Sequence, residues 1–357
     1  MGPSLTKIMS YYVRGTALGV SNLISRTARR SLKPRWLWFE VTDRCNSRCL
    51  HCNIWRKKPT KDALTPKEIE KALSDPLFRD VEYVLNSGGE AVLRDDLEEI
   101  ILTEHRALPK AVLQLSTNGL LPERVIKVVK SAIKHGANIS VGVSLDGIGE
   151  KHDLIRGVKG NFHNVERLLQ ELVILRKKYE DKISPTIGFT LSDSTLSSLE
   201  EVRAYAQKLN VYCLAQWYNT SSFYDNTNRK LASSKNLIKA VQSFPLTPLN
   251  EMWLNSLVGK PIKFRCFAMD TFCALKCNGD IVPCLSLWDA TAGNIRESSP
   301  TDIWNSSDAK KVKKLVKSCQ GCLNNWGVGW SFESSFIPIL LFNIKHLRTV
   351  LGKLGER

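Results

Sequence analysis

The chain has 357 residues, of which 43% are hydrophobic and 24% are charged. This composition predicts a globular protein with room for one barrel-sized domain and a smaller one, and it excludes a chain without an apolar core. The formal net charge is +16, and residues 1–39 hold seven Lys or Arg residues but no Asp or Glu. Such an uneven distribution of charge indicates an anionic partner.

The two ends of the chain are basic and partly apolar. Residues 5–32 mix apolar side chains with four arginines, which is typical of a cationic amphipathic helix on anionic lipid or of a transit peptide. Near the other end, the apolar run Phe336–Phe342 is too short to cross a bilayer. The alternative is that both ends pack on the barrel as core elements. Most of the ten cysteines lie in closely spaced sets and no cleavable signal peptide is visible, so we expect a cytoplasmic protein, with membrane association left open.

Between the two ends, apolar strand-like runs alternate with segments of helical period. The expected strands are 36–42, 81–86, 111–116, 139–145, 183–191 and 211–217, and the expected helices are 65–73, 95–105, 122–135, 161–179 and 195–209. Alternating strands and amphipathic helices predict a parallel sheet with right-handed crossovers. The sequence therefore predicts an α/β fold, a partial (β/α)6 barrel of the TIM type, with its active end where the strands end.

Three cysteines follow the first expected strand in a CxxxCxxC pattern, at Cys45, Cys49 and Cys52. Three thiolates on one short loop suit an iron-sulfur cluster better than zinc, which usually takes a fourth ligand. His51 could be that fourth ligand, but it is adjacent to Cys52 and could bend onto the same ion only with difficulty. One iron of a three-cysteine 4Fe-4S cluster would stay open to a small chelating molecule.

This loop resembles that of the radical S-adenosylmethionine (radical SAM) enzymes. The resemblance implies that Cys45, Cys49 and Cys52 hold a 4Fe-4S cluster whose open iron binds S-adenosylmethionine. After the second strand, Gly88, Gly89 and Glu90 resemble the family's GGE motif, with Glu90 accepting a hydrogen bond from the methionyl ammonium group.

Polar side chains at the other strand ends complete the expected cofactor site. Ser116 and Asn118 follow the third strand, and Ser144 and Asp146 follow the fourth, where they could bind ribose hydroxyls or substrate or could equally serve turn chemistry. Arg156 occupies the place of a family arginine that pairs with the carboxylate of S-adenosylmethionine, and a solvated loop arginine is the alternative.

No general base can be assigned from the sequence. Asp146, His152 and Tyr218 are weak catalytic candidates because they lie near expected strand ends.

A second group of cysteines follows the barrel. Its pattern resembles the auxiliary-cluster extension called SPASM, in the shortened twitch form that holds one further 4Fe-4S cluster. By that resemblance the ligands are Cys266, Cys284, Cys319 and Cys322, with Gly279 opening a hairpin that leads to Cys284. Cys273 and Cys277 lie in the same segment and could replace one pair, and a four-cysteine zinc site is the structural alternative.

The chain is thus divided into a basic extension (1–34), a radical SAM core (35–235), a twitch/SPASM-like iron-sulfur domain (236–330) and an apolar, basic tail (331–357). The resemblance implies an oxidoreductase that cleaves S-adenosylmethionine reductively and abstracts hydrogen from a substrate C–H bond. A small polar or sugar-like substrate that is oxidised, with the second cluster as electron acceptor, is the leading hypothesis. Modification of a ribosomally made peptide, by cross-linking or epimerisation, is the alternative, and a non-catalytic iron-sulfur or zinc module is the competing class.

Five lysines between residues 310 and 317 predict a basic helix beside Cys319. Such a helix could meet an acidic electron donor such as flavodoxin or ferredoxin. Nucleic-acid binding is disfavoured because the basic runs lack interleaved aromatic residues or a docking motif.

Overall fold

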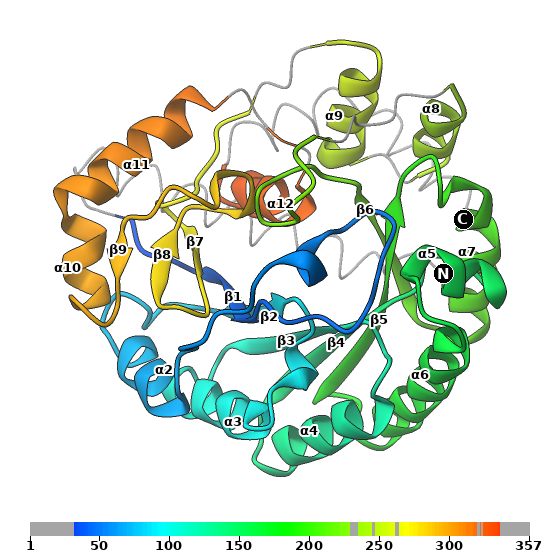
Figure 1. The fold of residues 1–357 in the computed structure, drawn as a ribbon, viewed down its shortest axis with the longest axis horizontal. Coiled ribbons are helices and arrows are strands. Elements are labelled where there is room, and N and C mark those ends of the chain that lie inside the picture. Colours follow the sequence, from blue (N-terminus) through cyan, green and yellow to red (C-terminus); the bar gives the residue numbers. More distant parts are fainter. Residues whose placement is uncertain are drawn as a thin grey trace, which may run out of the picture.

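The computed structural model describes residues 32–228, 235–244, 247–260, 264–319, 322 and 324–335. Most of the predicted N-terminal extension and the apolar run Phe336–Phe342 lie outside these residues. Within them, six strand–helix repeats build a curved sheet with helices along its outer side (Figure 1). No helix in the described ranges combines the length and the apolar character that crossing a membrane requires.

All six predicted strands and all five predicted helices are confirmed, with end points that differ from the predictions by a few residues. The strands are β1 (Trp36–Thr42), β2 (Tyr83–Gly88), β3 (Val112–Thr117), β4 (Asn138–Ser144), β5 (Ile183–Leu191), β6 (Tyr212–Trp217), β7 (Phe272–Leu275), β8 (Asp280–Val282) and β9 (Gly293–Asn294). The helices are α2 (Pro66–Leu73), α3 (Leu97–Ala107), α4 (Pro122–Lys134), α5 (Glu150–Arg156), α6 (Asn161–Lys178), α7 (Leu199–Lys208), α8 (Lys235–Gln242), α9 (Pro248–Leu257), α10 (Pro300–Asn305), α11 (Ser307–Ser318) and α12 (Asn325–Glu333).

Local sequence signals fix where several helices begin. Thr65 caps α2 by accepting a hydrogen bond from the backbone N–H of Glu68, whose carboxylate bonds back to Thr65. Pro122 opens α4, where its fixed φ angle suits the first helical turn and its missing N–H costs nothing.

The sheet has nine strands in the order β6-β5-β4-β3-β2-β1-β7-β8-β9. Strands β1 to β6 are parallel neighbours in chain order, which agrees with a partial barrel of the TIM type. Strand β7 of the cysteine-bearing module pairs in parallel with β1, so that Trp36 lies opposite Phe272 and Phe39 opposite Leu275. The C-terminal module therefore continues the sheet of the barrel, which the sequence did not predict.

A tight hairpin joins β7 to the antiparallel strand β8. Gly279 opens it with a φ of +98°, a conformation that favours glycine, as the sequence predicted. The chain beyond β8 leads to Cys284 and then to β9, α10 and α11.

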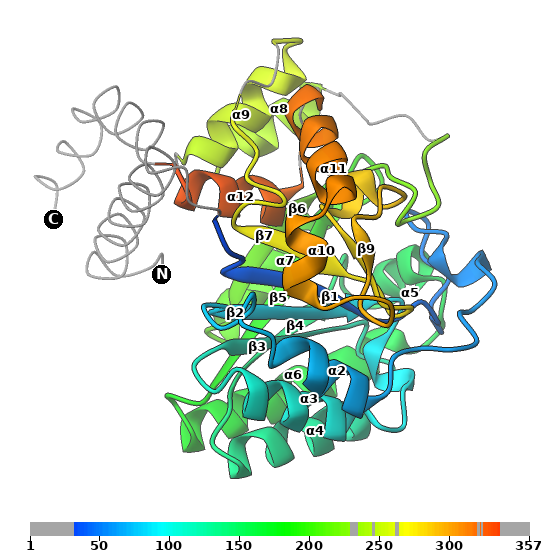
Figure 2. The same ribbon diagram turned by 90° about the vertical axis from the view of Figure 1, so that its left-hand side faces the viewer.

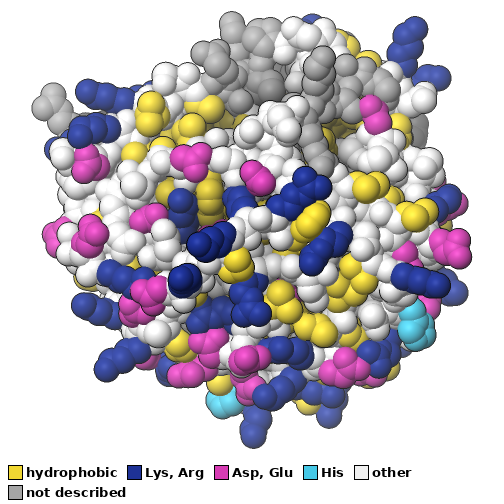
Figure 3. All heavy atoms as spheres, viewed as in Figure 1, with side chains coloured by type: hydrophobic (Ala, Val, Ile, Leu, Met, Phe, Trp, Pro, Cys, Tyr) yellow, Lys and Arg dark blue, Asp and Glu magenta, His cyan; other side chains and the backbone are white. Residues whose placement is uncertain are grey.

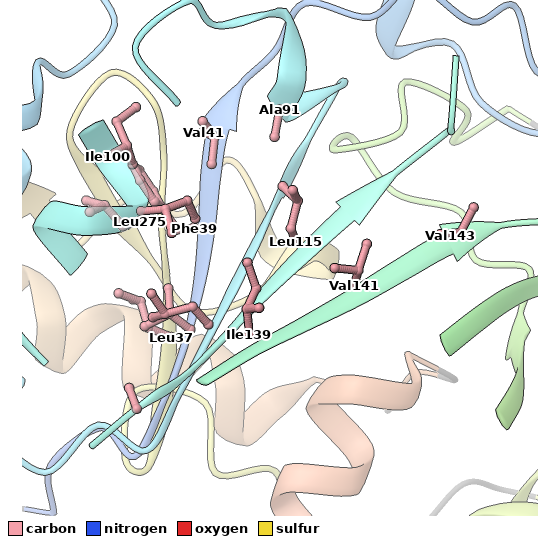
Figure 4. Packing of buried hydrophobic residues seen from close by; sticks show 14 of the residues in the cluster. Leu37, Phe39, Val41, Ala91, Ile100, Leu115, Ile139, Val141, Val143 and Leu275 are labelled. Carbon is pink, nitrogen blue, oxygen red and sulfur yellow. The ribbon is translucent and has the colours of Figure 1, made fainter. Parts of the chain in front are cut away.

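The two faces of the sheet bury different side chains. Toward helices α2 to α7, alternate residues such as Leu37, Phe39 and Leu115 pack into one apolar core, which Figure 4 shows from close by. On the opposite face, Trp36 and Trp38 belong to a second cluster rich in aromatic rings. Figure 2 shows α2, α3 and α4 on one side of the sheet and α8, α9, α11 and α12 on the other. The inner face of the barrel thus looks toward the cysteine-bearing module.

Candidate active site

The cysteine loop lies where β1 ends, and the end of β2 holds one side of it. The backbone N–H of Gly89 donates to the carbonyl oxygen of Thr42 at 2.7 Å, and that of Glu90 donates to the carbonyl oxygen of Arg44 at 2.7 Å. A Cβ atom on Gly88 would lie 2.1 Å from the oxygen of Thr42, and one on Gly89 would lie 2.1 Å from that of Arg44. These two glycines are therefore required for close packing against the cysteine loop itself.

Helix α5 holds the other side of the loop. The backbone N–H groups of Arg48 and Leu50 donate to the carbonyl oxygens of Arg156 at 3.0 Å and Ile155 at 2.9 Å. Gly157, which ends α5 in the left-handed conformation, lies so close that a Cβ atom there would be 2.4 Å from the oxygen of Arg48. The loop is thus held between two parts of the barrel by backbone contacts.

Cys45, Cys49 and Cys52 line one cavity at this end of the barrel. Burial raises the pKa of Cys45 to about 12 and that of Cys52 to about 11. A bound metal ion deprotonates the thiols that coordinate it, so loading this site must release protons. Three thiols on one cavity wall are a donor set that fits an iron-sulfur cluster.

Arg156 connects this cavity to a buried acid. Its guanidinium lies 3.8 Å from the Sγ atom of Cys49 and forms an ion pair of 2.8 Å with Asp146. The other carboxylate oxygen of Asp146 accepts a hydrogen bond of 2.7 Å from the backbone N–H of Thr190. Asp146 is fully buried and does not line the cavity. The structure therefore places Asp146 behind Arg156, where it orients the guanidinium.

His152 is also buried behind the cavity wall. The backbone N–H of Asp146 donates to its Nδ1 atom at 3.2 Å, and its Nε2 atom lies 3.1 Å from the side-chain amide of Asn161. Burial lowers the pKa of His152 to about 4, so the ring is neutral near pH 7. His152 does not line the cavity, whereas Tyr218, the third weak catalytic candidate, does.

Glu90 is buried against the cavity and accepts two hydrogen bonds. The donors are the backbone N–H of Asn118 at 2.6 Å and the hydroxyl of Thr117 at 2.9 Å. Burial raises the pKa of Glu90 to about 7. A cationic group bound beside this carboxyl would favour its ionised form.

Most of the predicted cofactor residues share this cavity. Those that line it are Gly88, Gly89, Glu90, Ser116, Asn118, Ser144 and Arg156. Side chains that the sequence analysis did not single out line it as well, among them Trp38, Gln216, Asn219 and Trp326. Strand alternation could have indicated Trp38 as an inward residue, but no local signal marks Trp326, which comes from α12.

The second cysteine group is assembled from separate segments. Cys266 interacts electrostatically with Cys322 and Cys319, and Cys284 interacts with Cys322 and Cys266. Burial raises the pKa of Cys266 to about 11. The four predicted ligands of the auxiliary cluster thus lie in one neighbourhood.

The two alternative cysteines lie elsewhere. Cys273 is buried on β7 opposite Leu37, and Cys277 lies beside the carboxyl group of Glu40, which raises the pKa of this thiol after the larger effect of burial. Among the residues that the structure describes, no group of three His, Cys, Asp or Glu side chains has the geometry of a metal site, so both ligand sets stay predictions.

Two family models match the chain. The radical SAM superfamily model matches residues 39–206, and a model described as an iron-sulfur cluster-binding domain, SPASM, matches residues 266–323. The first match covers the strands and helices around the cysteine loop, and the second covers all four predicted ligands of the auxiliary cluster.

Curated relatives share mainly the barrel. The chain is 33% identical to the pre-heme d1 synthase of Dinoroseobacter shibae over 50% of this chain and 41% of that protein. It is also 33% identical to the Fe-coproporphyrin III synthase of Methanosarcina barkeri, over 48% of this chain and 40% of that protein. A longer match, 23% identical over 79% of this chain and 67% of the relative, is to the sporulation killing factor maturation protein SkfB of Bacillus subtilis. The chain spans about two fifths of the length of the first two relatives.

Solved structures share the fold over most of the chain. The structure of anSMEcpe with bound AdoMet and a Cp18Cys peptide superposes with a TM-score of 0.57 at 17% identity, covering 90% of this chain and 99% of that one. The structure of Streptococcus suis SuiB bound to S-adenosylmethionine gives a TM-score of 0.56 at 16% identity, covering 80% and 68%. Residues 39–206 thus form a domain of the radical SAM superfamily, whose cofactors are a 4Fe-4S cluster and S-adenosylmethionine, and residues 266–323 form an iron-sulfur cluster-binding SPASM domain.

Proposed function

We propose that this protein is an enzyme that cleaves S-adenosylmethionine reductively and abstracts a hydrogen atom from a C–H bond of its substrate. The observation that carries the proposal is the convergence of Cys45, Cys49, Cys52, Glu90 and Arg156 on one cavity at the carboxyl end of the barrel strands. When bound, the cluster and S-adenosylmethionine supply an electron and a 5'-deoxyadenosyl radical, chemistry that no side chain provides.

The protein's own residues would bind the cluster and S-adenosylmethionine and orient them. Cys45, Cys49 and Cys52 would hold the cluster. Glu90 would accept a hydrogen bond from the ammonium group of S-adenosylmethionine, and Arg156 would pair with its carboxylate.

Side chains of the barrel would also bind the ribose and exclude water. Ser116, Asn118 and Ser144, which line the cavity from the ends of β3 and β4, would bind the ribose hydroxyls. The aromatic side chains of the inner face would keep water from the reactive space.

We propose oxidation of a small polar or sugar-like molecule as the outcome, with an auxiliary cluster held by Cys266, Cys284, Cys319 and Cys322 accepting the electron. The electrostatic contacts among these four thiols support one shared site. Modification of a ribosomally made peptide is the second candidate. It is favoured by the fold, because structures of this fold include anSMEcpe with a bound peptide and SuiB bound to the precursor peptide SuiA.

An acidic electron donor would meet helix α11. Lys310, Lys314 and Lys317 are exposed there, whereas Lys311 pairs with Asp308 on the same helix. On the face shown in Figure 3, Lys and Arg side chains stand among Asp and Glu rather than in one separate patch. The exposed lysines of α11 are therefore our specific candidates for the donor's contact.

Anaerobic reconstitution tests the proposal. With iron and sulfide, the protein should take up about eight irons per chain, and dithionite with S-adenosylmethionine should release 5'-deoxyadenosine. A protein that binds zinc and almost no iron, or a first cluster held by four protein ligands and unaffected by S-adenosylmethionine, would contradict it. Either result would favour a non-catalytic binding or electron-transfer module.

A further inference from the structure

Two buried hydrogen-bond donors at the cavity have no partner in the described part of the chain. One is the indole Nε1 atom of Trp38, a residue on β1 that is only 7% exposed, and the other is the side-chain Nδ2 atom of Asn219, in the loop after β6. Both residues line the cavity. An unpaired buried donor is costly, so two at one cavity point to a ligand that accepts hydrogen bonds there.

The packing of Trp38 keeps this donor in place. Its ring meets that of Phe223 edge-on, with centroids 5.9 Å apart, and Phe223 in turn contacts Trp288 at 4.7 Å. A side chain held by such contacts cannot easily turn away to find another partner. The indole N–H therefore belongs to a rigid wall of the cavity.

Charged side chains contribute little to the rest of the cavity. Among the described residues that line it, Glu90 and Arg156 are the two from the group Asp, Glu, Lys and Arg. Under the proposed function both are used by the ammonium and carboxylate groups of S-adenosylmethionine. Apart from His51, which also lines the cavity, a phosphate or carboxylate on the reacting part of the substrate would find no further cationic side chain among the described lining residues, and burying it unpaired would be costly.

Neutral polar groups fill this part of the wall instead. They come from β3, β5 and β6 and are Gln114, Thr186, Thr190 and Gln216. The side chain of Gln216 forms no hydrogen bond to any described residue. Hydroxyl and amide side chains both donate and accept, as do the hydroxyl groups of a sugar ring.

We propose that this cavity binds an uncharged, polyhydroxylated ring whose oxygen atoms accept hydrogen bonds from Trp38 Nε1 and Asn219 Nδ2. Trp38 and Trp326 also contribute apolar carbon atoms to the lining of the cavity, which suits the C–H groups of such a ring. Peptide carbonyl oxygens accept such hydrogen bonds as well, and the experiment therefore includes a peptide probe. This inference rests on the proposed function and narrows its substrate class.

The test measures binding to the reconstituted protein with S-adenosylmethionine present and no reductant, by ligand-observed NMR. The neutral probes are methyl glucoside and myo-inositol, and the charged probes are glucuronate, glucosamine and glucose 6-phosphate. A capped alanine dipeptide represents the peptide class. We expect both neutral probes to bind about tenfold more tightly than the charged probes and the dipeptide.

Two variants test whether binding of the neutral probes depends on the two donors. Trp38→Phe keeps the ring but removes its N–H, and Asn219→Asp replaces the donor by a carboxylate. Each should weaken neutral binding about tenfold, and Asn219→Asp should also bind glucosamine more tightly than the unaltered protein does. The matched control is Trp253→Phe, because Trp253 also has a buried indole N–H without a partner among the described residues but does not line the cavity. Iron content and thermal unfolding check that each variant is folded.

Several results would overturn the inference. They are equal or tighter binding of a charged sugar, binding of the dipeptide without the sugars, no binding of either neutral probe, or folded donor variants that bind like the control. The proposed function fails separately, if the unaltered protein releases no 5'-deoxyadenosine with dithionite and S-adenosylmethionine.

Discussion

The two cysteine groups of this protein are built in different ways. The first places Cys45, Cys49 and Cys52 on one loop, which backbone hydrogen bonds from β2 and α5 hold on both sides. The second gathers its cysteines from the segment before β7, the end of the β7–β8 hairpin and the end of α11. A site on one loop depends on the contacts that hold this loop, whereas a site shared among distant segments also depends on how the whole module packs.

This difference predicts that damage to the two sites has different consequences. The first site should behave as part of the barrel and carry the chemistry of S-adenosylmethionine. The second should behave as part of the module and affect what happens after hydrogen abstraction. The predictions below run from the largest expected effect to the smallest.

Cys49→Ala should abolish cleavage of S-adenosylmethionine and lower the iron content by about half, because two cysteines cannot retain the first cluster. Iron analysis and chromatography of 5'-deoxyadenosine measure both effects. Cys213→Ala is the matched control, because Cys213 lies half-buried on β6 outside both cysteine groups. Cleavage by the Cys49 variant at the normal rate would contradict the assignment.

Cys322→Ala should lower product formation far more than it lowers cleavage of S-adenosylmethionine, and it should also remove about half of the iron. The ratio of product to 5'-deoxyadenosine is the measurement. Cys273→Ala is the control, since Cys273 is buried on β7 in the same module and shows no electrostatic interaction with another thiol, whereas Cys266 and Cys284 do. If the Cys273 variant lost iron and the Cys322 variant kept it, the ligand set would have to be reassigned.

Asp146→Asn should leave Arg156 as an unpaired buried charge beside the first site. Breaking a buried ion pair costs about 3–5 kcal/mol, so we expect a loss of that order in the free energy of unfolding and weaker binding of S-adenosylmethionine. Denaturant unfolding and equilibrium binding measure these. The control is Glu201→Gln, which breaks the exposed pair of Lys151 and Glu201 and should change stability by less than about 1 kcal/mol. Equal effects of the two substitutions would show that Asp146 does not support Arg156.

Glu104→Gln should change how stability depends on pH while leaving both cysteine groups intact. Glu104 is buried on α3 and accepts a hydrogen bond of 2.8 Å from Asn86, and burial raises its pKa from 4.5 to about 8. The folded protein therefore keeps this carboxyl protonated where the unfolded chain ionises. Its contribution to stability is complete below pH 4.5 and is lost as the pH rises to about 8.

Unfolding free energies at pH 5 and pH 9 test this behaviour. Between these two pH values, the free energy of unfolding of the unaltered protein should fall by on the order of a few kcal/mol more than that of the Glu104→Gln variant. Glu99→Gln, on the exposed side of the same helix, is the control. Identical pH profiles for the Glu104 variant and the unaltered protein would rule out this source of pH dependence.

The sequence was most informative where structure depends on local pattern. Hydrophobic period and capping residues such as Thr65 located the six strands and the helices between them. The spacing of Cys45, Cys49 and Cys52 located the first site, because its ligands share one loop. The predicted side chains at the ends of β2 and β3 do line the cavity.

Long-range contacts account for what the sequence did not predict. Asp146 follows a barrel strand as expected, but its side chain pairs with Arg156 and does not line the cavity. This orientation depends on contacts with α5 and β5, which lie elsewhere in the sequence. The pairing of β1 with β7 joins residues that lie more than two hundred positions apart, and no local pattern encodes it. Trp326 lines the cavity for the same reason.

The pairing of β1 with β7 also matters for any shortened protein that contains the barrel without the C-terminal module. A chain cut before residue 266 would lose β7 and leave one whole side of β1 without backbone partners. An unpaired strand edge of that kind is a template for self-association. The C-terminal module thus covers the edge of β1, and we expect the barrel without this module to aggregate more readily than the full chain.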